Sequence, residues 1–162
     1  MAITNSLSKR LRVRTSISAF TRMPCINIPI DPIGPVIEIG VSQPTSTANG
    51  THPTVYWIKA VVDTGCSHTS IHTSVAVKCG LTVLGKASAN TPGGAHAVNL
   101  YHGDLFLRPI IRGKPFEFPF NDRGLVEMTH QNPDFDALLG MDILNYGTFH
   151  TNGVLKQATF CW

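Results

Sequence analysis

The stretch that decides the fold is Val61-Val62-Asp63-Thr64-Gly65-Cys66-Ser67-His68-Thr69-Ser70-Ile71. Residues 55–62, which lead into it, are rich in β-branched and aromatic side chains and predict a buried strand that ends at Asp63. Gly65 lets the backbone reverse directly afterwards, and the hydroxyl side chains that follow can bond to the main chain of the turn. A carboxylate at the end of a buried strand loses hydration unless a partner or a function compensates. The sequence therefore places its chemistry at Asp63.

The residues from Asp63 to Ile71 resemble the active-site loop of aspartic proteases of the retroviral type, the retropepsins. In that family the residue after the glycine is usually Ala or Ser, whereas this chain has Cys66, which is small but leaves a thiol beside the acid. The resemblance implies that Asp63 is the catalytic acid. It also implies that its neighbours support the catalytic loop, namely Thr64, Gly65, Ser67 and Thr69.

A second motif, Leu138-Leu139-Gly140-Met141-Asp142-Ile143-Leu144, lies about 75 residues further along. An apolar strand is predicted to reach Gly140, and a helix over residues 141–146 is predicted to end before Gly147. In the retropepsins a similar strand-to-helix segment packs behind the catalytic loop. The resemblance assigns that role to Leu139, Gly140 and Asp142.

Residues 89–96 contain two consecutive glycines and predict the tip of a β-hairpin, with residues 97–101 as its returning strand. The resemblance implies that this hairpin is the flap that covers bound substrate, with Thr91, Pro92, Gly93 and Gly94 at its tip. An ordinary exposed hairpin is the alternative interpretation. His96 and His102 lie near this tip and are candidates for tuning a response to pH, but an exposed hairpin histidine without a role is the simpler interpretation.

The rest of the chain favours an all-β fold, because 14 Gly and 11 Pro in 162 residues punctuate short alternating runs. Further strands are predicted over residues 25–30, 36–41, 83–84, 105–111, 116–120 and 153–160, with a surface loop over residues 42–53. One or two helical turns are predicted from an N-cap at Ser74 to a stop at Gly80. The resemblance covers roughly residues 36–162 and implies a closed β-barrel with one or two short helices, forming half of a two-fold homodimer.

The domain division follows the charge, which is uneven along the chain. Five of the 13 basic residues lie in the first 24 positions, which contain no acid, and the remainder carries a net charge of −2. We therefore expect a basic extension over residues 1–24, a protease domain over residues 25–162, and no nucleic-acid partner. No run is long enough to span a membrane, so a cytoplasmic location is expected, with organellar import as an alternative suggested by the Arg- and Ser-rich start.

The four cysteines, at irregular spacings, do not suggest a disulfide framework, and reduced thiols are the simpler expectation. A zinc site is a minor alternative, because four potential ligands fall within fourteen residues: Cys66, His68, His72 and Cys79. Their spacing matches no zinc-finger pattern, so no metal or other cofactor is expected.

Only one Asp-Thr-Gly occurs in the chain, whereas hydrolysis by this route requires two carboxylates that share a proton. The resemblance therefore implies an aspartic endopeptidase that is complete only as a homodimer, with Asp63 of each subunit facing its mate and an extended peptide as substrate. The alternative is a catalytically silent module that uses the same fold for dimerisation or peptide binding.

Overall fold

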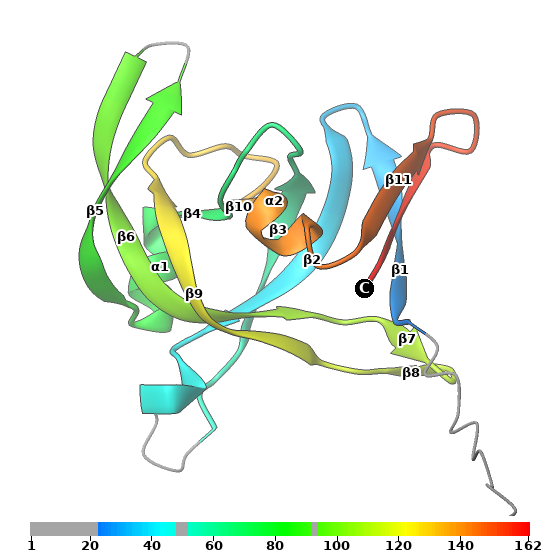
Figure 1. Cartoon of the computed structure of the whole chain (residues 1–162), viewed down its shortest axis with the longest axis horizontal. Coiled ribbons are helices and arrows are strands. Elements are labelled where there is room, and N and C mark those ends of the chain that lie inside the picture. Colours follow the sequence, from blue (N-terminus) through cyan, green and yellow to red (C-terminus); the bar gives the residue numbers. More distant parts are fainter. Residues whose placement is uncertain (1–22, 48–51, 92–93) are drawn as a thin grey trace, which may run out of the picture.

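The computed structural model describes residues 23–47, 52–91 and 94–162, and these residues form a predominantly β structure (Figure 1). The first half comprises strands β1 (Cys25–Asp31), β2 (Gly34–Ser42), β3 (Tyr56–Val62), β4 (Ser70–His72) and β5 (Thr82–Thr91), the 3-10 turn η1 (Thr45–Thr47) and helix α1 (Thr73–Cys79). The second half comprises β6 (Gly94–Leu107), β7 (Ile110–Ile111), β8 (Lys114–Pro115), β9 (Phe118–Met128), β10 (Ala137–Leu139), helix α2 (Met141–Leu144), β11 (Thr148–Asn152) and β12 (Gln157–Cys161).

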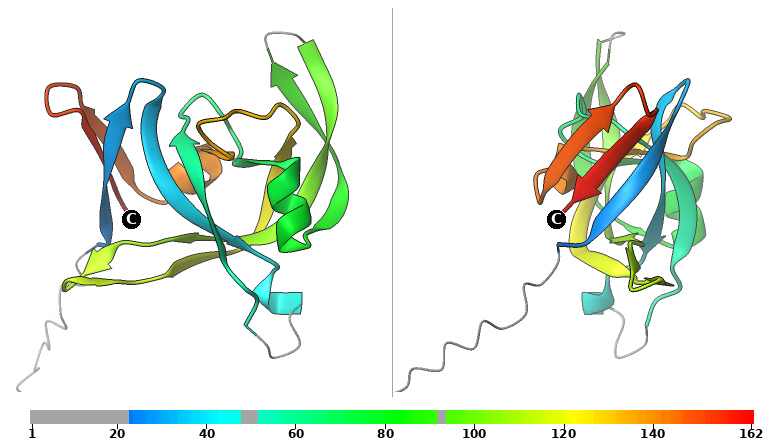
Figure 2. Two further views of the ribbon diagram at one scale, coloured as in Figure 1. Left: turned by 180° about the vertical axis from the view of Figure 1, so that it is seen from behind. Right: turned by 90° about the vertical axis from the view of Figure 1, so that its right-hand side faces the viewer.

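Ten of these strands form one sheet in the order β11-β12-β1-β2-β3-β10-β4-β9-β6-β5, and β2 pairs additionally with β6. The short β10 lies between β3, to which it is parallel, and β4, to which it is antiparallel. The segment between β3 and β4 therefore passes over the end of β10. The β5–β6 hairpin and the sheet of β1, β11 and β12 stand on opposite sides of that segment (Figure 2).

The core consists of the apolar side chains that alternate along these strands and face inward. Ile39, Val41 and Ala60 are fully buried, as are Ile71 and Leu139 from the strands around β10. One cluster includes these residues together with Ile143 and Leu144 of α2. Burial of this single core holds the strand ends beside Asp63 in place, because apolar surface removed from water is the main stabilising contribution in such a domain.

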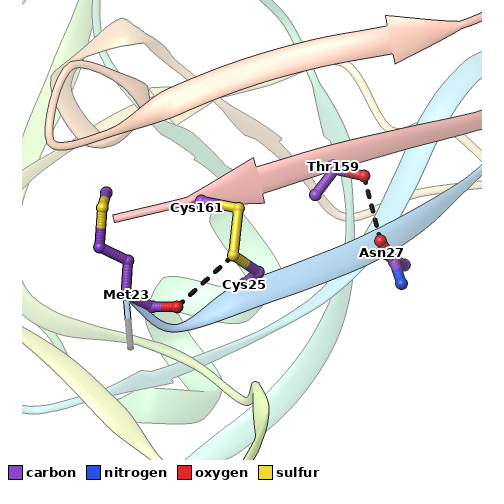
Figure 3. The surroundings of a disulfide bond; sticks show 5 residues. All are labelled: Met23, Cys25, Asn27, Thr159 and Cys161. Carbon is purple, nitrogen blue, oxygen red and sulfur yellow. Dashed lines mark hydrogen bonds between the residues drawn. A yellow bond between two sulfur atoms is a disulfide. The ribbon is translucent and has the colours of Figure 1, made fainter. Parts of the chain in front are cut away.

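The terminal sheet, defined as β1, β11 and β12, corrects the expectation of reduced thiols. Cys25 and Cys161 pair across β1 and β12 and form a disulfide, near which the Thr159 hydroxyl donates to Asn27 Oδ1 (Figure 3). Beside the disulfide, the ring of Trp162 stacks on Phe160 with centroids 5.0 Å apart. Spacing could not predict this bond, because 136 residues separate the two cysteines and only the strand register brings them together.

Several predicted boundaries also needed correction. The N-cap of α1 is His72 and not Ser74, because the His72 ring accepts from the Ser74 amide, while the predicted stop at Gly80 is confirmed with φ +63°. The predicted strand over residues 153–160 begins only at Gln157, and β11 precedes it. The predicted helix over residues 141–146 ends at Leu144.

Two strands, β5 and β9, are longer than predicted. β5 extends from Thr82 to Thr91, and β9 continues to Met128 through a segment that the sequence left unassigned. Most of the predicted N-terminal extension, residues 1–22, lies outside the described residues, as do Pro92 and Gly93 of the predicted flap tip. Neither helix in the described part of the chain has the length and apolar character that crossing a bilayer requires.

Candidate active site

The catalytic loop comprises residues 63–69 and begins where β3 ends. Strand β10 fixes both the end of β3 and the start of this loop. The backbone amide of Asp63 donates to the Leu139 carbonyl at 3.0 Å, which extends the parallel β3–β10 pairing by one residue. Beyond the loop, β4 pairs with the other edge of β10. Both ends of the loop are therefore attached to the same three-residue strand, and the chain between them reverses over its end.

Asp63 itself is half-buried at the start of this reversal. Its Oδ1 accepts a hydrogen bond from the Gly65 amide at 2.9 Å, and its carbonyl accepts from the Cys66 amide at 3.2 Å. A Cβ at position 65 would lie 3.2 Å from Asp63 Oδ1, so any larger residue would crowd the carboxylate. Thr64 and Gly65 are exposed, which leaves this edge of the loop open to a partner molecule.

A polar latch, formed by Thr69 and Asp142, holds the loop from behind. The amide and hydroxyl of Thr69 both donate to Asp142 Oδ1 at 2.8 Å, and the Gly140 amide donates to the Thr69 hydroxyl at 3.1 Å. Thr69 is fully buried, so these bonds also satisfy groups that would be costly to leave unpaired.

The first turn of α2 completes this support. The amides of Met141 and Asp142 donate to the carbonyls of Cys66 and Ser67 at 2.8 and 3.1 Å. Gly140 allows the close approach, because a Cβ there would lie 2.6 Å from the backbone carbon of His68. The role that the resemblance assigned to Gly140 and Asp142 thus has a physical basis in this contact.

Leu139, the third residue of that prediction, is fully buried beneath the loop and bonds to it through its backbone carbonyl. Ser67, by contrast, is exposed. Its hydroxyl contacts Nδ1 of His68 at 3.0 Å, so the loop support that its side chain provides is local.

Cys66 replaces the usual Ala or Ser next to the acid. Burial raises the pKa of its thiol, and the neighbouring Asp63 carboxylate raises it further by charge and hydrogen bonding. The thiol therefore stays protonated at neutral pH, and it is not the activated thiolate that nucleophilic catalysis by cysteine requires.

A cleft of about 470 Å³ opens beside the loop, between it and the β5–β6 hairpin. Gly65, Cys66 and Ser67 form one wall, and Ala89 and Val98 of the hairpin form another. Val126, Met128 and Leu138 add apolar surface. The cleft therefore has the mixed apolar and polar lining that is typical of ligand sites.

The base of the hairpin is tied to the body of the protein through Glu127, a contact that sequence analysis missed. Its carboxylate accepts hydrogen bonds from the Asn99 amide, the Tyr101 hydroxyl and the Thr73 hydroxyl, at 2.9, 2.9 and 3.1 Å. The bond from the Asn99 amide is the main reason that the pKa of Glu127 is lowered. No local sequence pattern indicated these contacts of Glu127, because its hydrogen-bond partners come from β6 and α1.

At the predicted flap, Thr91 pairs with Gly94 at the end of the two hairpin strands, and Gly94 has φ +111°. A β-hairpin is therefore present where the sequence predicted one, and Figure 1 shows it rising beside the loop that follows β3. Its closure over a substrate stays a prediction.

The residues of the zinc alternative do not come together. His72 caps α1, while Cys79 is buried and its thiol donates to the Val41 carbonyl. Burial raises the pKa of Cys79 to about 11, which disfavours the thiolate that zinc binds. Within the described ranges, no group of three or more His, Cys, Asp and Glu side chains is arranged to hold a metal ion.

Comparison with known families agrees with this geometry. A family model described as aspartyl protease matches residues 45–143, which is more than half of the chain and includes the first motif and all but the last residue of the second. The chain belongs to this family. The predicted resemblance is thereby confirmed, and the protein is a retropepsin-like member of the aspartyl proteases.

Two solved structures are similar to this retropepsin-like chain. A retropepsin-like aspartic protease from Rickettsia conorii is 18% identical with a TM-score of 0.52, over 85% of this chain and 90% of that one. The retroviral protease-like domain of Ddi1 from Leishmania major is 14% identical with a TM-score of 0.41, over 77% and 87% of the two chains. No curated protein matches at a significant level. At these identities the first match supports the fold, which is mostly β with few helices.

Proposed function

We propose that the protein is an aspartic endopeptidase that acts as a homodimer, with Asp63 as the catalytic residue of each subunit. The observation that carries this proposal is the placement of Asp63. Its carboxylate lies at the end of a buried strand, in a loop latched from behind by Asp142 and bordering a cleft. Such a position suits a group that must be held rigidly next to a bound peptide.

The chemistry requires a second carboxylate. In aspartic proteases generally, one carboxylate takes a proton from water while the other donates its proton to the substrate carbonyl oxygen. The resulting tetrahedral intermediate collapses when the amine leaves with a proton from the dyad. Because this chain has one Asp-Thr-Gly, the second acid must come from Asp63 of the partner copy. The dyad then titrates as a pair and not as two independent groups.

Dimerisation is consistent with the exposed edge of the catalytic loop. Thr64 and Gly65 are both exposed, so the Thr64 hydroxyl is available for a hydrogen bond to the partner loop and Gly65 allows close approach. The pairing of β2 with β6, in addition to the linear strand order, supports a closed barrel as the body of each subunit.

The β5–β6 hairpin is the part that would cover a bound peptide. In this proposal residues 91–94 form the flap tip, and a peptide binds in extended form between the hairpin and the floor of the cleft, adding its backbone as a strand. Residues 25–162 form the protease domain. Residues 1–24 form an extension that the dimer can remove from other copies by its own activity.

The test compares the parent protein with Asp63→Asn and, as a matched control, with Asp134→Asn, which changes an exposed acid outside the site. Each is incubated with a peptide library between pH 4 and 7, and products are followed by mass spectrometry. We expect Asp63→Asn to abolish cleavage of the library and of the N-terminal extension while remaining a folded dimer by sedimentation. Equal cleavage by the parent and Asp63→Asn would disprove the mechanism.

A further inference from the structure

Three histidines from three separate segments line the cleft. His68 belongs to the catalytic loop, His96 to strand β6, and His130 to the segment that follows β9. Histidine is the side chain whose ordinary titration falls between pH 5 and 8. A cleft bordered by three of them offers several imidazole N–H donors to a bound acidic group.

The strand register places His96 on the same face of the hairpin as two other residues of the cleft lining. His96 and Val98 are two residues apart on β6, so their side chains lie on the same face, and His96 pairs directly with Ala89. All three residues line the cleft. The ring of His68 is oriented locally, because its Nδ1 contacts the Ser67 hydroxyl at 3.0 Å.

Apart from the histidines, one ionisable carboxylate lies among the described residues that line the cleft. Among the described residues that line it, none is a lysine, an arginine or an aspartate, and the one carboxylate is Glu127. That carboxylate is engaged by donors from β6 and α1. Lys86 is not among these lining residues, and its ammonium group donates a hydrogen bond to Asn99 Oδ1.

The two acids behind and beside the cleft are also engaged. Asp142 Oδ1 accepts both bonds from Thr69, and Asp63 Oδ1 accepts from the Gly65 amide. The Cys66 thiol, which lines the cleft, is uncharged at neutral and acidic pH because its pKa is raised. Among the described lining side chains, the histidines are therefore the basic groups that can face a bound acid.

We propose that this cleft binds an acidic side chain of the substrate peptide, glutamate in particular, through His68, His96 and His130. The apolar surface of Val98, Val126 and Leu138 suits the aliphatic part of a glutamate, while the histidines supply N–H donors for its carboxylate. All three histidines are exposed, so their rings are accessible to a peptide that enters the cleft. This inference rests on the proposed function, since it names the substrate class of the same site.

The experiment uses pairs of peptides that differ only by glutamate or glutamine at one position. A sequence cleaved in the library is scanned position by position, and kcat/KM is measured for each pair from pH 7.5 to 5.5. The titration of the catalytic dyad affects both members equally and cancels in their ratio. At one position we expect the Glu:Gln ratio to rise about tenfold as the pH falls, which corresponds to about 1.4 kcal/mol.

Variants identify the source of the change. His96→Gln and His130→Gln should each reduce the rise, and the triple variant that also contains His68→Gln should abolish it. His150→Gln, which changes an exposed histidine on β11 outside the cleft, should leave it intact. A purely structural role of the three histidines would lower kcat/KM for both peptides and leave the ratio rising.

The inference is overturned if no scanned position shows a rising ratio, or if the rise survives in the triple variant. Failure of the proposed function is a separate outcome, in which the parent cleaves no peptide of the library. In that case library peptides that differ only by glutamate or glutamine at one position are titrated by calorimetry against the parent and the triple variant. Tighter binding of the glutamate peptide at pH 5.5 in the parent alone would then support the cleft assignment, and equal binding would reject it.

Discussion

The catalytic loop and the terminal sheet are held in place by different physical means. The loop over residues 63–69 is held by short polar contacts, chiefly those of Thr69 and Asp142. The terminal sheet is held by the disulfide between Cys25 and Cys161 and by stacked aromatic rings such as those of Phe160 and Trp162. The first set fixes atoms near a charged group, whereas the second restrains the two ends of the domain.

This difference in stabilising contacts predicts which perturbations affect each region. Buried hydrogen bonds depend on geometry, so the loop should respond to a single added or removed atom. A disulfide acts largely on the unfolded chain, so the terminal sheet should respond to reduction while the site keeps its geometry. A glycine permits close packing in both regions, because a Cβ at Gly140 would meet His68 and a Cβ at Gly147 would meet the Cys161 carbonyl.

The largest effect is expected from Gly140→Ala. The added methyl would lie 2.6 Å from the His68 backbone carbon and 2.8 Å from the Thr69 amide nitrogen, neither of which can move without displacing the loop. We expect a loss of about 3 kcal/mol or more in unfolding free energy, together with loss of peptide cleavage. Urea titration measures the loss of unfolding free energy. Gly153→Ala is the control, since a Cβ there meets nothing within 4 Å. Equal stability of both variants would show that the contact is not tight.

Removing the disulfide should have the next largest effect on stability and a small one on the site. Cys161→Ser opens a link across 136 residues of sequence separation, and we expect a loss of about 2–4 kcal/mol. The cleavage rate at a temperature well below the unfolding midpoint should change little. Cys66→Ser, assayed with and without reductant, is the control for thiol effects outside the disulfide. Unchanged stability of the parent on reduction would contradict this division of roles.

The polar latch should show strong coupling between its two residues. Thr69→Val removes the hydroxyl that donates to Asp142 and accepts from Gly140, and we expect about 1–3 kcal/mol of destabilisation. Asp142→Asn weakens the same contacts, so the double variant should cost less than the sum of the singles. Thermal unfolding of the four proteins measures the coupling. Additive effects would mean that the latch is not a unit.

The sequence predicted the catalytic loop better than it predicted the terminal sheet, for a physical reason. The loop is encoded locally, because the β-branched residues end at Asp63 and Gly65 permits the turn. The terminal sheet depends on pairing between residues at opposite ends of the chain. Neither Cys25 nor Cys161 has a neighbour in sequence that indicates its partner, so only the register of β1 and β12 determines the disulfide.

The same reasoning applies inside the candidate site. The strand before Asp63 and the strand-to-helix junction at Gly140 were predicted because apolar runs and glycine positions are properties of short segments. The Glu127 contacts were missed because they join β6, β9 and α1, which are far apart in the sequence. The histidine lining of the cleft was visible only in part, since His96 was noted beside the hairpin tip while His130 had no local signal.

The smallest expected effect tests the Glu127 contacts through pH. Because the folded-state pKa of Glu127 is lowered, its contribution to stability is fully present above the unfolded pKa of about 4.3 and is lost as the pH falls through the folded value. Glu127→Gln should therefore destabilise the protein by less than about 1 kcal/mol at pH 7, since the group is partly solvated, and by less still at pH 3. Thermal unfolding at the two pH values measures the difference, with Glu38→Gln, a mostly exposed glutamate near Arg108, as the control. A constant difference at both pH values would mean that the ionised carboxylate does not anchor the hairpin base, and that packing alone holds this edge of the cleft.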